Sequence, residues 1–322
     1  MNNLPQPPKQ KPSLPSKLTF NEYLCSATIF LYDLDVEGKF NAQIESEANQ
    51  IRSANIGHGR PDAGDVLDFL LNQGDALKRI LGILRIPQEK FMRIVSLVRE
   101  LDAPLTEVMS KRVNEREWNI EKIERKIREN SGHNPFAQRI VAILLNGYND
   151  AKLKATLPQV YRERLRLETL NEYTTEQDLC FKLKDRNMAS YNAMKGFAVE
   201  ERIKEQVRIS HQTYAQGACA FVDRKVDLMV PCAVDPRILI MSSYDETTSS
   251  GQSTRASDMI TLYQNLQHKR MQGDTEHYFV NVVDGGGWLA RREDLKRMWK
   301  ACDFCLNINT LPQLKDIIEA IM

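Results

Sequence analysis

The sequence predicts a protein in two parts, an all-α N-terminal domain followed by an α/β C-terminal domain with a mixed sheet flanked by helices. Apolar residues recur at three- and four-residue spacing from Leu18 to about Leu170, as on one face of an amphipathic helix. From Tyr191 on, short apolar runs bounded by glycine and proline predict strands instead. Because these runs alternate with helical segments, we expect at least part of the sheet to be parallel.

The helical domain is expected over residues 18–190, after a disordered, proline-rich tail formed by residues 1–17. This tail has prolines and lysines where a signal peptide would need an apolar core, so a cytoplasmic protein is expected. Within the helical domain, one typical apolar stripe consists of Val66, Phe69 and Leu70. Proline and glycine recur where such helices would begin or end, which predicts a bundle with short loops.

The C-terminal domain is expected over residues 191–322. It begins with a helix whose apolar stripe includes Val199, Ile203 and Val207. Three strands are predicted next, in the sequences GACAFVD, VDLMVP and PRILIMSSY. A helix, the strand HYFVNVV, a helix, the strand CDFCLNI and a final helix complete the predicted order.

The composition is that of a soluble globular protein, with 42% hydrophobic and 27% charged residues. No apolar run reaches the roughly 18 residues that a membrane span requires, so no membrane partner is expected. A net charge of +1 excludes a globally basic nucleic-acid-binding protein, and any contact with DNA must come from a local patch. Cys302 and Cys305 are expected to flank a strand rather than bind zinc, because no second pair of ligands follows.

Acidic residues on two neighbouring predicted strands are the main candidates for chemistry. Asp227 begins the strand VDLMVP, and the next strand ends in the residues Met241 to Glu246. Carboxylates can hold Mg²⁺, which lowers the pKa of a bound water and neutralises charge on a phosphate. The arrangement resembles the core of the PD-(D/E)xK nucleases. In these enzymes an aspartate on one strand and an acidic-x-lysine triplet on the next bind Mg²⁺ and activate a water.

Two further segments resemble type II restriction endonucleases of this superfamily. KGFAVE, on the helix before the strands, resembles a helix that carries a glycine and a glutamate in these enzymes, which assigns Glu200 to the metal site. The alternative is an exposed glutamate that pairs with Lys204 one turn later. DGGGW, from Asp284 to Trp288, resembles a DGxGW that ends a later strand. Its glycines are expected to permit positive φ and close packing at a strand-to-helix turn.

The polar segment TTSSGQSTRA resembles a loop and helix start that follows the catalytic strand in several restriction enzymes. Its side chains suit hydrogen bonds to phosphates and base edges, and a helix N-terminus favours anions. Arg255 would bind a phosphate or a guanine. Ordinary N-capping is the alternative, since Ser and Thr often precede helices. The expected DNA-binding residues are Thr247, Thr248, Ser249, Ser250, Gln252 and Arg255.

The strand that ends in Glu246 departs from the nuclease pattern. Side chains alternate along a strand, so Met241, Ser243 and Asp245 are expected on one face and the intervening residues, through Glu246, on the other. If Met241 holds the acid position and Ser243 the lysine position, both groups are missing. Methionine sulfur is moreover a poor ligand for Mg²⁺.

Three alternatives follow for the catalytic site. Asp245 can act as the second metal ligand beside Asp227, with Glu200 helping from the helix. Glu246 can replace it if a bulge flips the register of the strand. Otherwise the site is degenerate. Lys225, two residues before Asp227, is the candidate positive charge near the attacked phosphate.

The resemblance implies a type II restriction endonuclease, which hydrolyses phosphodiester bonds in double-stranded DNA at a short specific sequence and depends on Mg²⁺. A palindromic target would imply a homodimer, because symmetric sites are read by symmetric proteins. The main alternative is a protein with a degenerate nuclease fold that binds DNA without cleaving it. A more distant alternative is a helical interaction protein. The helical domain is expected to form dimer contacts, clamp the DNA or read flanking bases.

Overall fold

The computed structural model describes residues 12–56, 60–102, 119–172, 175–273 and 276–322. The chain divides into two compact units. The α/β unit comprises Ser190–Met322 together with the N-terminal segment up to Glu37, and the helical unit comprises Gly38–Ala189. Of the tail predicted to be disordered, residues 1–11 lie outside the described residues, and residues 12–17 form no regular secondary structure.

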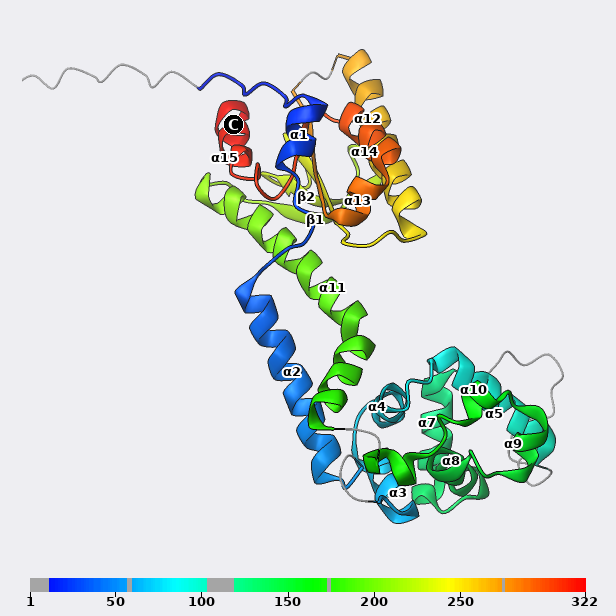
Figure 1. Cartoon of the computed structure of the whole chain (residues 1–322). Helices are drawn as coiled ribbons and strands as arrows, with labels where there is room; N and C mark the ends of the chain where they lie inside the picture. The colour runs from blue at the N-terminus through cyan, green and yellow to red at the C-terminus, as the bar shows by residue number, and fades with distance from the viewer. Residues whose placement is uncertain (1–11, 57–59, 103–118, 173–174, 274–275) are drawn as a thin grey trace, which may run out of the picture. The chain divides into compact units, whose positions relative to one another are not determined.

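A mixed five-stranded sheet forms the centre of the α/β unit, as the sequence predicts (Figure 1). The strand order is β1-β2-β3-β4-β5. The pairs β1–β2 and β2–β3 are antiparallel, and the pairs β3–β4 and β4–β5 are parallel. Tyr244 pairs with Asp284, so β3 and β4 end at the same edge of the sheet. The strands are β1 (Ala215–Cys219), β2 (Arg224–Val230), β3 (Ile238–Tyr244), β4 (Tyr278–Asp284) and β5 (Phe304–Leu306).

Helices cover both faces of this sheet, which explains why its parallel strands are continuous apolar runs. One face packs against α11 (Glu176–Ile209) and α15 (Gln313–Ile321) through a core that includes Ile203, Ile240 and Ile317. We call it the α11 face. In the α/β unit this helix contributes its residues from Ser190 on.

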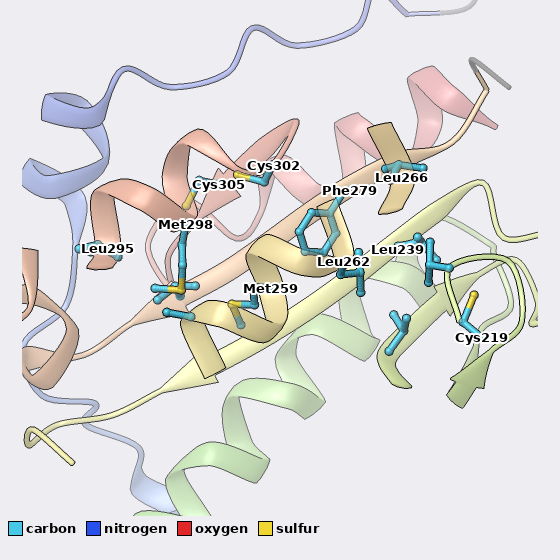
Figure 2. Close-up of a cluster of buried hydrophobic side chains, with 14 of the residues drawn as sticks. Cys219, Leu239, Met259, Leu262, Leu266, Phe279, Leu295, Met298, Cys302 and Cys305 are labelled. Atoms are coloured by element: carbon cyan, nitrogen blue, oxygen red, sulfur yellow. The ribbon is translucent and has the colours of Figure 1, made fainter. Parts of the chain in front are cut away.

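The opposite face, which we call the α12 face, packs against four helices. Its core includes Met259, Leu262 and Phe279, and the buried thiols of Cys302 and Cys305 belong to it (Figure 2). Both cysteines are free, and they flank the start of β5 as predicted. The helices are α1 (Phe20–Ser26), α12 (Gly251–Met271), α13 (Gly286–Ala290) and α14 (Arg292–Lys300).

The segment from Leu18 to Glu37 packs in the α/β unit, although the sequence pattern assigns it to the helical domain. The Tyr23 ring is completely buried in the α12-face core, and its hydroxyl donates a hydrogen bond to the Val283 carbonyl of β4. After α1, the Thr28 N–H donates to the Asp284 carboxylate at 2.8 Å. Short helical periodicity identifies a helix but not its packing partner, so these tertiary contacts were not predicted.

The helical unit consists of helices alone within the described residues. The stripe of Val66, Phe69 and Leu70 is buried as predicted, and Asp62 caps the same helix through a capping box with Asp65. Its helices are α2 (Leu34–Ser53), α3 (Ala63–Asn72), α4 (Ala76–Ile83), α5 (Gln88–Leu101), α7 (Ile120–Arg128), η1 (Glu129–Gly132), α8 (Pro135–Asn146), α9 (Ala151–Thr156), α10 (Gln159–Arg162), η2 (Leu167–Glu172) and the start of α11. In the ranges that the structure covers, no helix has the length and apolarity needed to cross a bilayer.

Candidate functional site

Asp227 lies where the alternation of side chains along β2 breaks. Val226 and Met229 both pack in the α12-face core, whereas Leu228 packs in the α11-face core. The register between β1 and β2 shifts just before Gly217, so that β2 carries one extra residue at this point. Gly217 has φ of +109°, which suits the irregular strand opposite. Such a bulge re-aims a side chain, and here the residue it affects is the candidate metal ligand.

The Asp227 carboxylate is held against β3. Its Oδ2 atom accepts hydrogen bonds from the Ser242 N–H at 2.8 Å and from the Ser242 hydroxyl at 3.4 Å. Burial raises the pKa of Asp227, and the negative charge of Glu200 raises it further, against the opposing effects of Ser242 and Lys225. A half-buried carboxylate on which a second acid acts is a site where a cation is electrostatically favoured.

Glu200 lies on α11, and its negative charge acts on Asp227. Its Oε1 atom accepts from the Gln216 side chain at 2.7 Å, and the Lys204 ammonium lies 2.9 Å away. The pairing with Lys204 was the alternative for this residue, and the structure contains this ion pair, while the charge of Glu200 also acts on Asp227. Lys225 is exposed, and its charge acts on the same carboxylate.

Asp245 belongs to a different network on the α12 face. The Arg255 guanidinium lies 2.6 Å from the Asp245 carboxylate, and Ser243 Oγ lies 3.3 Å from it. The Trp288 indole donates to the same Ser243 hydroxyl at 3.2 Å. Since Asp227 contacts Ser242 and Asp245 contacts Ser243, the two carboxylates expected to share a metal lie on opposite faces of β3.

The two positions where the nuclease pattern expects an acid and a lysine carry no charge. Met241 packs against the α12-face core, and Ser243 is buried at 5% exposure among its hydrogen-bond partners. Both therefore face away from Asp227, together with Asp245, as the alternation of side chains predicts. Within the described residues, no group of three or more His, Cys, Asp or Glu side chains is arranged to hold a metal.

Glu246 lies on the α11 face, in a buried cluster at the end of β3. Its Oε1 atom is 2.7 Å from the Lys195 ammonium and accepts from the Tyr244 hydroxyl at 2.5 Å and from the Leu31 N–H at 3.1 Å. Lys195 also lies over the Tyr191 ring, 4.2 Å from its centroid. The bulge that could have re-aimed Glu246 occurs in β2 rather than β3, and this carboxylate already has a cationic partner.

Lys195 is a residue whose importance the sequence did not reveal. The sequence pattern identifies it only as the start of the KGFAVE segment, yet its side chain is 4% exposed. Desolvation by burial lowers the pKa of Lys195, but the hydrogen bonds and charge interactions with Glu246 and Tyr191 together outweigh it, so that the pKa lies above its usual value. The sequence signal for the contacts of Lys195 is Tyr191, one helical turn earlier, because residues four apart on a helix are neighbours.

Three consecutive glycines, which follow β4, pack closely against the loop that follows β3. Gly285 has φ of +106°, and a Cβ atom on it would lie 2.3 Å from the Asp245 carbonyl oxygen. A Cβ atom on Gly287 would lie 2.4 Å from the Thr247 carbonyl oxygen. The Gly287 N–H donates to the Asp245 carbonyl at 2.9 Å. The prediction that these glycines permit positive φ and close packing is confirmed, and the backbone they contact is that of the site loop.

Asp284, which precedes the glycines, has a structural role. It is 2% exposed. Its carboxylate accepts from three backbone N–H groups, those of Thr28 at 2.8 Å and of Gly285 and Ile308 at 2.9 Å. Burial raises the pKa of Asp284 although these N–H groups oppose the shift. The residue ties three segments together at the edge where β3 and β4 end.

Replacement of Gly287 by alanine is expected to destabilise the protein by about 1–3 kcal/mol, because the added methyl group must displace backbone atoms. Urea denaturation followed by circular dichroism measures this change. The matched control is Gly196→Ala on α11, where nothing lies within 4 Å of the position that the new Cβ atom would take. Alanine is favoured over glycine in a helix by about 1 kcal/mol, so the control should be neutral or stabilising. Equal stability of the two variants would contradict the packing of this turn.

The segment after β3 is mostly exposed. Thr247, Thr248, Ser249, Ser250 and Arg255 are accessible, as DNA-binding residues must be. Gln252 differs from the expectation because it is completely buried, and its Oε1 atom accepts from the Ser249 N–H at 3.1 Å. It therefore shapes the loop rather than presenting its amide to a ligand. The alternative of ordinary capping is weakened, because the N-cap residue of α12, Ser250, forms no side-chain cap bond.

The site consists of an aspartate at a strand bulge, a glutamate on a helix and an exposed polar loop. A comparison with known protein families covers these residues. Residues 173–317 match the family model of the DpnII restriction endonuclease. The chain resembles a restriction endonuclease of the DpnII family. This match confirms the resemblance predicted from the sequence and supports a nuclease that acts on DNA.

The matched segment covers slightly less than half of the 322-residue chain. It includes α11, all five strands and the loop after β3. Every candidate site residue therefore lies within the matched segment. It leaves out α1 and the segment to Leu31, which complete the α12 face and the Glu246 cluster. No curated protein matches the chain at a significant level.

Proposed function

We propose that the protein is a type II restriction endonuclease of the PD-(D/E)xK superfamily that hydrolyses phosphodiester bonds in double-stranded DNA at a short specific sequence. The observation that supports the proposal is the bulge at Asp227, a carboxylate on which the negative charge of Glu200 acts, within the segment that matches the DpnII family.

The donor set fits Mg²⁺, which typically takes one or two carboxylates and keeps several waters and phosphate oxygens as its other ligands. Asp227 and Glu200 would hold the ion, and Asp245 is less suited because its carboxylate pairs with Arg255 on the other face of β3. When bound, Mg²⁺ would supply an activated water and neutralise charge on the phosphate. The Ser242 N–H fixes the Asp227 carboxylate, and Gln216 and Lys204 fix that of Glu200.

Positive charge near the scissile phosphate would come from Lys225, which is exposed, or from Lys204 on α11. Glu246 would act indirectly, by anchoring the end of β3 to Lys195. The exposed residues from Thr247 to Arg255 would contact the DNA, and recognition of a symmetric sequence would require a homodimer.

The second candidate function is DNA binding without cleavage. Met241 and Ser243 favour it, because they occupy the positions of the acid and the lysine and both are directed into the α12-face core. A protein of this kind would keep the fold and the polar loop but would lack a complete set of catalytic groups.

Incubation of the purified protein with plasmid DNA separates the two functions. We expect discrete fragments in the presence of Mg²⁺ and none when EDTA replaces it, because a divalent cation is needed to activate the water. Agarose gel electrophoresis measures the outcome. Tight DNA binding without fragments, at any Mg²⁺ concentration tested, would favour the non-cleaving protein. The absence of both cleavage and salt-sensitive binding would reject both functions.

A further inference from the structure

A strip of positive charge lies in the helical unit, whereas the candidate catalytic residues belong to the α/β unit. Two adjoining pockets of about 420 and 160 Å³ share Arg85 and Lys182 in their linings. Their walls come from α4 and the turn after it, from the chain around η2, and from the start of α11. The cations that line the two pockets are Lys78, Arg85, Arg164, Arg166, Lys182 and Arg186.

Acids outside the two pockets pair with part of this charge, since Lys78 lies 2.9 Å from Asp75 and 3.2 Å from Glu121, and Arg186 lies 3.2 Å from Glu47. The same linings include two acidic residues, Glu163 and Asp185. The whole chain has a net charge of +1, whereas the cations in these linings outnumber the acids in them even when the ion-paired Lys78 and Arg186 are set aside. Concentrated positive charge along one groove is the electrostatic feature that attracts a polyanion.

The geometry of the larger pocket brings Arg186 close to α4. Gly82 makes this possible, because a Cβ atom there would lie 2.6 Å from Cδ of Arg186. One guanidinium nitrogen of Arg186, Nη2, lies 3.2 Å from the Glu47 carboxylate. The other, Nη1, is buried without a hydrogen-bond partner among the described residues. An orphaned donor in a pocket wall is satisfied when a ligand oxygen binds there.

Electrostatics inside the strip are unfavourable in the absence of a ligand. Burial lowers the pKa of Lys182, and the positive charge of Arg85 lowers it further, against the opposing effect of Asp178. Burial also lowers the pKa of Arg186. Arg85 is exposed and forms no ion pair with the residues that the structure describes. An anion bound between these groups would relieve their mutual repulsion, which gives the site a physical reason to bind one.

We propose that this basic strip, from Lys78 through Arg85 and Lys182 to Arg166, binds the phosphodiester backbone of DNA outside the candidate catalytic site. The inference rests on the proposed action on DNA and adds a second, sequence-independent contact to it. A single small anion is saturated by two or three donors. The six cations that line the two adjoining pockets therefore fit a row of phosphates better. Backbone contacts of this kind supply affinity and orientation but no base specificity.

The test is a binding titration of the full chain carrying Asp227→Asn, with a fluorescein-labelled duplex of about 30 base pairs and fluorescence anisotropy as the readout. In the double variant Arg85→Glu/Lys182→Glu, we expect the Kd to rise at least about tenfold at low salt. The slope of log K against log salt should fall by about two, since each phosphate contact contributes about 0.9. The loss should be equal for duplexes of unrelated sequence.

The matched control is Lys39→Glu/Arg125→Glu, which reverses two exposed charges of the same unit outside both pockets. Its Kd should change less than about twofold. The milder pair Arg85→Gln/Lys182→Gln, with circular dichroism melting of every variant, guards against a folding defect. An affinity loss in the reversal variant that merely equals that of the control would overturn the proposal.

Two further measurements separate the possible failures. Plasmid cleavage by the wild-type chain tests the nuclease directly. If the wild type cuts DNA and the reversal variant binds as the control does, the basic strip is rejected and the nuclease stands. If the strip variants lose binding and the wild type never cuts, the strip stands and the nuclease is rejected. Stabilisation by inorganic phosphate that the reversal abolishes, with duplex binding unchanged, would identify a small-anion site and reject DNA as the ligand.

Discussion

Replacement of Asp227 by asparagine is expected to lower the rate of DNA cleavage about a thousandfold, equivalent to about 4 kcal/mol of transition-state stabilisation. The carboxylate would lose the negative charge that holds the cation. The amide keeps an oxygen, and because both bonds from Ser242 go to a single carboxylate oxygen, the side chain can remain in place. Single-turnover cleavage of a plasmid measures the rate, and DNA affinity should be unchanged.

Stability should move in the opposite direction from activity in this variant. Burial raises the pKa of Asp227 in the folded state, so ionisation of this carboxyl group is harder there than in the unfolded chain. The stability of the wild type therefore falls as pH rises from the unfolded-state pKa through the raised folded-state pKa, and it stays lower above that point. Asparagine does not ionise, so the variant should be at least as stable as the wild type at neutral pH.

Asp223→Asn is the matched control, since it makes the same change at an exposed position of the preceding hairpin where φ is +51°. Asparagine tolerates this left-handed conformation as well as aspartate does. The control should retain full cleavage activity. If Asp227→Asn cut DNA as fast as this control, the proposed metal site would be rejected.

The order of elements in the α/β unit could be predicted from the sequence because each strand there is a short apolar run between glycine or proline signals. The alternation along β3 was equally predictable, since the side-chain period of a strand is two. Thus Ser243 and Asp245 lie together on one face, and Tyr244 and Glu246 lie together on the other. These features depend on neighbouring residues alone.

The bulge at Asp227 was not predicted, because it depends on how β2 pairs with β1. A glycine within a predicted strand, Gly217, was the available signal, since such glycines often mark bulges. Without the bulge, the sequence pattern paired Asp227 with Asp245 as metal ligands. With it, the charge of Glu200 acts on Asp227, and Asp245 faces Arg255. The identity of the metal ligands stays a prediction.

Loss of the Lys195 ammonium is expected to have the largest effect on stability. In Lys195→Met the Glu246 side chain, 9% exposed, would remain buried without its cationic partner. Breaking a buried ion pair from one side typically costs about 3–5 kcal/mol, because an uncompensated charge is left behind. Such a loss is a large part of the roughly 5–15 kcal/mol by which most domains are stable. Urea denaturation monitored by circular dichroism measures it.

A second substitution should restore most of that stability. In Lys195→Met/Glu246→Gln the buried charge is gone, while the amide oxygen can still accept from the Leu31 N–H and the Tyr244 hydroxyl. The double variant should therefore be more stable than Lys195→Met alone, as replacement of a whole buried pair is often close to neutral. Lys39→Met removes an exposed lysine and should change stability by less than about 0.5 kcal/mol.

The pH dependence of the wild type provides an independent measure of the same ion pair. The pKa of Lys195 is raised above its ordinary value of 10.5, because its interactions with Glu246 and Tyr191 together outweigh desolvation. A lysine whose folded-state pKa is raised contributes stability that is fully present below 10.5 and is lost as pH rises through the folded-state pKa. In the wild type this loss should begin above about pH 10.5, and it should be absent from the double variant. A double variant no more stable than Lys195→Met would show that the lysine stabilises the end of β3 by packing on Tyr191 rather than by its charge.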